Sequence, residues 1–141
     1  MDFSRYENLR ALVRANFSEQ TRALVDEALE YADGKLAGVC RYDGAPMLDH
    51  AAAVASIVIS EVGLGRNSAV SSILHDVVRL AHKERPADEF LALTEEIRNR
   101  FGEQVVGITM GLANISELKL KTSKEQADNF RDLIVSYSED P

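Results

Sequence analysis

The centre of the chain, residues 73–78, reads Ile73-Leu74-His75-Asp76-Val77-Val78. A histidine and an aspartate stand side by side here, inside an apolar run with helical periodicity. A second histidine, His50, lies one predicted helix upstream and follows Asp49. The two segments together predict a helical scaffold that carries a histidine–aspartate site.

Outward from this stretch, almost every segment repeats its apolar residues with the period of an α-helix. No segment shows convincing period-two alternation, so we predict an all-α fold, a multi-helix bundle with short connections. The helix around residues 47–61 is apolar nearly all round and is expected to be central. The loop at 39–46 breaks the pattern, and 119–122 is expected to be an exposed loop. We expect helices over residues 6–16, 18–32, 47–61, 68–82, 86–101, 105–115 and 123–137.

Size and composition narrow the class of protein. The 141 residues fit a single domain, with 45% hydrophobic and 28% charged residues. The net charge of −7 opposes non-specific binding to nucleic acid or anionic membranes, but not a small anion held by a few basic groups. A lone cysteine, Cys40, excludes a disulfide framework. With no signal peptide and no stretch that could span a bilayer, we predict a cytoplasmic domain.

The polar residues near the centre allow two interpretations. On a helical wheel, His75, Asp76 and Arg79 fall opposite the apolar stripe, so they form either a solvated face with an ion pair or part of a site. His50 is either a core histidine bonded to backbone or a ligand. In the functional interpretation, His50, His75 and Asp76 bind one divalent transition-metal ion, which activates water for attack on a phosphoester.

Several longer segments, taken in order, resemble a known family. They are residues 41–50, 72–78, 101–106, 107–112 and 126–131. Their order and spacing are similar to those of the N-terminal HD domain of RelA/SpoT proteins, which make and hydrolyse the alarmone (p)ppGpp. The resemblance covers the chain from about Leu29 to its C-terminus.

The resemblance implies roles for particular residues. The metal ligands would be His50, His75 and Asp76 with a more distant aspartate, and the metal Mn²⁺ if the site is functional; otherwise no cofactor is expected. Arg41 matches an arginine that packs on guanine, and Asn129 matches an asparagine near the nucleotide. The implied partners are a guanine nucleotide, (p)ppGpp, and a synthetase domain of the same longer protein, with neither nucleic acid nor membrane.

The chain departs from the family at the positions that carry catalysis. Where hydrolases have Val-Val-Glu-Asp after the histidine–aspartate pair, this chain has Arg79 and Leu80 in the last two positions. Arg79 lies on the same helical face as Asp76, where it is expected to pair with that carboxylate and to repel a divalent cation. Leu80 cannot carry a proton. The chain also ends at Pro141, before the position of the fourth ligand, so we expect a domain over residues 1–141 that is truncated relative to the family.

These departures favour one of three hypotheses. The preferred one is a hydrolase-deficient HD domain with no intact catalytic residues, which is structural or regulatory for a synthetase (GTP pyrophosphokinase) domain outside this chain. The second is an active Mn²⁺-dependent (p)ppGpp 3′-pyrophosphohydrolase in which other carboxylates, such as Asp43 or Asp49, replace the lost pair. The third is a different HD phosphohydrolase or a helical interaction module.

Overall fold

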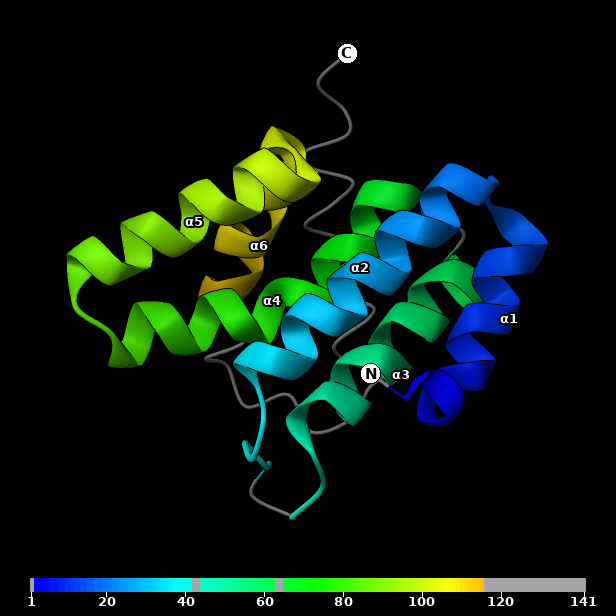
Figure 1. Ribbon diagram of the computed structural model, residues 1–141, viewed down its shortest axis with the longest axis horizontal. Helices are drawn as coiled ribbons and strands as arrows, with labels where there is room; N and C mark the ends of the chain where they lie inside the picture. The colour runs from blue at the N-terminus through cyan, green and yellow to red at the C-terminus, as the bar shows by residue number, and fades with distance from the viewer. Residues whose placement is uncertain (1, 42–43, 63–64, 116–141) are drawn as a thin grey trace.

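The structure, a computed structural model, describes residues 2–41, 44–62 and 65–115. This part of the chain is helical, without a strand, and its one β-type pairing is an isolated bridge between Cys40 and Pro46. Figure 1 shows the helices packed as a bundle. In order they are η1 (Phe3–Tyr6), α1 (Glu7–Asn16), α2 (Glu19–Lys35), α3 (Met47–Ile57), the π-helical turn η2 (Val58–Val62), α4 (Arg66–Glu84), α5 (Ala87–Phe101) and α6 (Glu103–Ile115).

The helix boundaries follow from local signals in the sequence. Ser18 caps α2, because its Oγ accepts a hydrogen bond from the Thr21 N–H at 3.3 Å. Pro46 and Pro86 directly precede α3 and α5, where a missing N–H costs nothing. Gly102 ends α5 at φ +106°, a conformation that favours glycine, and α6 begins at the next residue. The predicted all-α class is confirmed, while the last predicted helix and the 119–122 loop lie outside the described residues.

The helix at the centre of the bundle is α4, whereas α3 was expected to be central. It packs against α2, α3, α5 and α6 and crosses the middle of the bundle behind α2 (Figure 1). By contrast, α3 and η2 leave Ala53 and Ser60 exposed. A single exposed apolar residue is ordinary on a folded protein, so an apolar pattern alone does not settle which helix is central.

Candidate functional site

His75 and Asp76 lie in the buried centre of α4. Their exposed fractions are 0% and 2%, so the alternative of a solvated polar face is wrong. The His75 Nδ1 atom is 2.6 Å from the Ser72 carbonyl oxygen, which can only accept, so Nδ1 carries a proton. The other ring nitrogen, Nε2, is 3.3 Å from Asp76 Oδ1. A histidine that donates one N–H to a backbone carbonyl in this way resembles the metal-binding tautomer.

Arg79 occupies one side of the Asp76 carboxylate. Its Nε donates to Asp76 Oδ1 at 3.1 Å, and its Nη2 is 3.0 Å from the same oxygen. The ion pair expected from the spacing on the helix is therefore present. The second oxygen, Asp76 Oδ2, is buried and has no hydrogen-bond partner among the described residues. The carboxylate is thus neutralised at one oxygen and unsatisfied at the other.

His50 lies in the first turn of α3 and is buried, with 9% of its surface exposed. The preceding loop is closed by two backbone hydrogen bonds, from the Met47 N–H to the Val39 carbonyl at 3.0 Å and from the Arg41 N–H to the Ala45 carbonyl at 2.8 Å. This closure places Arg41 Nη1 3.0 Å from His50 Nδ1. Because a guanidinium only donates, Nδ1 accepts, and a neutral His50 then carries its proton on Nε2. Arg41 thus contacts His50, and its role at a guanine ring stays a prediction.

Asp49, beside His50, is held by the N-terminal segment. Arg5 Nη2 is 2.5 Å from Asp49 Oδ2, and the Tyr6 hydroxyl donates to Oδ1 at 3.0 Å. Burial and then this hydrogen bond raise the pKa of Tyr6 to about 12. Both carboxylate oxygens are therefore engaged, which disfavours Asp49 as a replacement catalytic carboxylate. Sequence reasoning missed Arg5 and Tyr6, because no local signal links them to a helix so far along the chain.

Leu80 follows Arg79 but turns to another side of α4. It packs against the core and lines a cavity of about 360 Å³ between α2, α4 and α5. The two residues at the family's carboxylate positions are thus separated: Arg79 contacts Asp76, whereas Leu80 packs against the core and lines the cavity. Of the remaining site candidates, Asp43 and Asn129 lie outside the described residues.

The described residues do not by themselves make a metal site. They contain no group of three or more histidine, cysteine, aspartate or glutamate side chains that could hold an ion. Two of the three predicted ligands, His50 and Asp76, have a guanidinium within hydrogen-bond distance. His75 and Asp76 are adjacent on α4, and His50 lies on α3, which packs against α4. The ligand assignment and Mn²⁺ stay predictions.

Comparisons with known proteins agree with the helical arrangement. Residues 28–141 match the HD domain family. The guanosine-3′,5′-bis(diphosphate) 3′-pyrophosphohydrolase of Aquifex aeolicus is 32% identical over 117 residues, which are 83% of this chain and 15% of that protein. The Haemophilus influenzae protein of the same name is 33% identical over 104 residues, 73% of this chain and 14% of that protein.

A relative named for a different activity is also similar. The GTP pyrophosphokinase of Myxococcus xanthus is 29% identical over 121 residues, 83% of this chain and 15% of that protein. The chain therefore spans about 15% of the length of these curated relatives. No helix in the described part of the chain is long and apolar enough to cross a membrane.

Proposed function

Because this chain belongs to the HD domain family and is homologous to the N-terminal region of RelA/SpoT (p)ppGpp hydrolase/synthetase proteins, we propose that it is a hydrolase-deficient HD domain of (p)ppGpp metabolism. It would support or regulate a synthetase domain of the same longer protein, in the cytoplasm. The synthetase reaction is not assigned to residues of this chain.

The observation that carries this proposal is the Arg79–Asp76 ion pair. The guanidinium lies 3.0 Å from Asp76 Oδ1, and the Asp76 side chain is only 3% exposed. A divalent cation about 4 Å from the guanidinium would be repelled by roughly 8 kcal/mol at an effective dielectric constant of about 20. Arg79 therefore competes with a metal for the same carboxylate. Leu80, at the second altered position, has no group that could move a proton.

A metal-dependent (p)ppGpp 3′-pyrophosphohydrolase is the second candidate, and two observations favour it. Asp76 Oδ2 is buried without a hydrogen-bond partner in the described part of the chain. His75 donates through Nδ1 to the Ser72 carbonyl, as metal-binding histidines commonly do. We rank this candidate lower because a cation at Asp76 must first displace Arg79, which also lies 4.0 Å from Met47 Sδ on α3.

The test compares the natural chain with a double variant, Arg79→Glu/Leu80→Asp. Mn²⁺ binding is measured by calorimetry, and pyrophosphate release from ppGpp is measured with and without Mn²⁺. We expect no Mn²⁺-dependent release by the natural chain, and at least tenfold tighter Mn²⁺ binding by the variant, because a carboxylate replaces the repelling cation at position 79. The third hypothesis, an HD domain outside (p)ppGpp metabolism, is tested by measuring the affinity of the chain for ppGpp and for ATP. Such a domain would show no preference for ppGpp.

A matched control keeps this test specific. Arg85→Glu/Leu91→Asp makes the same change of charge at exposed positions, since the Arg85 side chain is 55% exposed and Leu91 is 62% exposed. It should leave Mn²⁺ binding unchanged. Steady Mn²⁺-dependent pyrophosphate release by the natural chain would contradict the proposal and support the hydrolase.

A further inference from the structure

A second polar cluster lies between α1 and α2, on different helices from His75 and Asp76. A cavity of about 200 Å³ is lined there by Arg10, Val13, Arg14, Arg22 and Asp26. Three of these five residues are arginines, although the chain carries a net charge of −7. All five precede residue 28, where the HD domain match begins. A local excess of positive charge in an acidic protein marks this cavity as a candidate anion site.

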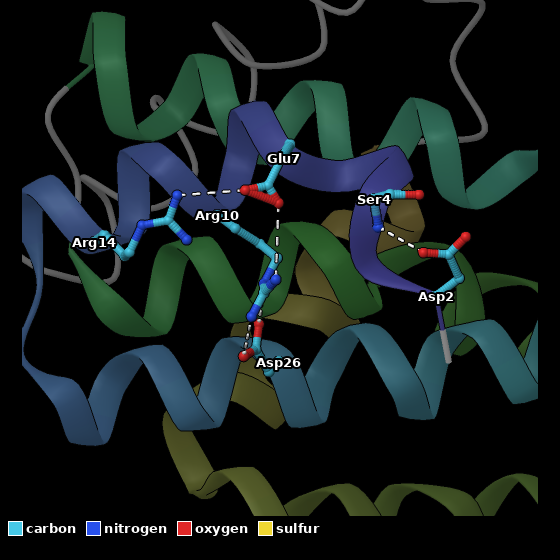
Figure 2. Close-up of polar contacts among 6 residues, drawn as sticks. All are labelled: Asp2, Ser4, Glu7, Arg10, Arg14 and Asp26. Atoms are coloured by element: carbon cyan, nitrogen blue, oxygen red, sulfur yellow. Dashed lines mark hydrogen bonds and ion pairs between the residues drawn. The ribbon is translucent and has the colours of Figure 1, made fainter.

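Two of the arginines are held by carboxylates to different degrees. Arg10 is bidentate on Asp26, with Nε and Nη2 at 3.0 and 3.1 Å, so its charge is largely neutralised. Arg14 meets Glu7 at 3.4 Å, and these side chains are 49% and 57% exposed. Figure 2 shows Glu7 between Arg14 and Arg10, and Asp26 beyond Arg10. An exposed pair at this distance is weak, so Arg14 can leave Glu7 for a stronger anion.

Arg22 is the residue that the internal ion pairs leave out. Its Nε atom is buried and has no hydrogen-bond partner among the described residues, and it forms no ion pair with a carboxylate there. Because no carboxylate of the described residues pairs with it, the guanidinium of Arg22 keeps its full charge for an anion in the cavity. Arg22 lines the same cavity as Arg14, and Val13, which is 2% exposed, forms an apolar wall beside them.

We propose that this cavity binds a small phosphate-bearing anion, with Arg14 and Arg22 as its two guanidinium donors. The planar donors of arginine match phosphate oxygens in pairs. The volume of about 200 Å³ lies below the range of roughly 300–1,000 Å³ typical of pockets for drug-sized ligands. The cavity therefore suits a phosphate or pyrophosphate group, and a nucleoside attached to that group would remain outside it. None of the residues that line this cavity belongs to the proposed metal or nucleotide site.

The test is a calorimetric titration of the 141-residue chain with inorganic pyrophosphate, phosphate and GDP at constant ionic strength. Pyrophosphate is expected to bind, and GDP to bind no more tightly than pyrophosphate. Arg22→Gln should weaken pyrophosphate binding about tenfold or more, because it removes a charged donor. Glu7→Gln should tighten binding severalfold, because it releases Arg14. Arg85→Gln, an equal loss of charge at an exposed position, should change nothing.

Circular dichroism of each variant checks that it is folded. If Arg22→Gln does not fold, the tightening expected from Glu7→Gln still tests the site, since Glu7 is exposed. The assignment is overturned if neither pyrophosphate nor phosphate binds at millimolar concentration. It is also overturned if Arg22→Gln and Arg85→Gln weaken pyrophosphate binding equally. It is also overturned if GDP binds over tenfold more tightly than pyrophosphate and Arg22→Gln leaves that binding intact.

Discussion

Replacing Arg79 by methionine should strongly destabilise the protein, because Asp76 would lose its cation. The Asp76 side chain is 3% exposed, and the Arg79 side chain is 16% exposed. The other oxygen of this carboxylate, Asp76 Oδ2, has no hydrogen bond within the described residues that would compensate for the loss of Arg79. Methionine keeps much of the length of the side chain and its contacts, so the change removes mainly the charge.

The expected cost follows from the burial of the carboxylate. Breaking a buried ion pair by removing one partner costs about 3–5 kcal/mol, because an uncompensated charge stays in the interior. We expect Arg79→Met to lie near 3 kcal/mol, since Arg79 keeps some access to solvent. A loss of that size would lower the melting temperature by about 10 °C. It is a large part of the total stability of roughly 5–15 kcal/mol that is usual for a domain.

The assay is urea unfolding of a double-mutant cycle made of Arg79→Met, Asp76→Asn and both together. The double variant should be more stable than Arg79→Met alone, because the buried negative charge is gone. Arg85→Met is the control: its pair with Glu89 is 3.5 Å long and 55% exposed on both sides, so we expect a cost below about 0.5 kcal/mol. A cost below about 1 kcal/mol for Arg79→Met, or additive effects in the cycle, would refute the reasoning about Asp76.

Two further predictions concern ionisation and backbone strain. Burial and the hydrogen bond to Asp49 raise the pKa of Tyr6 from 10.0 to about 12, so the contribution of Tyr6 to stability is full below pH 10 and falls by about 2–3 kcal/mol as pH rises to 12. Burial also raises the pKa of Tyr31, so Tyr6→Phe should make the loss of stability between pH 8 and 12 smaller without abolishing it. An unchanged loss in urea unfolding at the two pH values would contradict the prediction. Gly102→Ala should cost about 1–3 kcal/mol because φ is +106°, whereas Gly34→Ala, inside α2 with open space around it, should gain about 0.5–1 kcal/mol. The prediction is contradicted if Gly102→Ala and Gly34→Ala shift the melting temperature in the same direction.

At the proposed metal site and at the proposed anion site, a competing side chain already lies beside the group that would bind the ion. At the first, a positive side chain, Arg79, lies against the carboxylate that a cation needs. At the second, a negative side chain, Glu7, lies against the arginine that an anion needs. Because Asp76 is buried and Glu7 is exposed, the first contact should be strong and the second weak. The structure therefore favours an anion at α1 and α2 over a cation at α4.

Local features of the site were predictable from the sequence. Arg79 lies three residues after Asp76, a spacing that places both on one face of any helix, and the structure has the expected ion pair. The helix limits near Ser18, Pro86 and Gly102 were predictable for the same reason, because caps and breakers act within one turn. The arginine cavity was not predicted, although its residues are close in sequence, because the orientation of α1 against α2 decides which side chains converge.

Burial and long-range contacts were decided by the tertiary structure. The sequence shows that His75 and Asp76 lie opposite an apolar stripe, but α4 is surrounded by four other helices, so that polar side is buried as well. It contains no signal that Arg5 and Tyr6 would reach Asp49 across 44 and 43 residues. The sequence by itself determined the helices of the described residues and the Arg79–Asp76 pair, because these depend on neighbours along the chain. The packing of whole helices decided which charged side chains are buried away from water, because burial depends on residues distant in sequence.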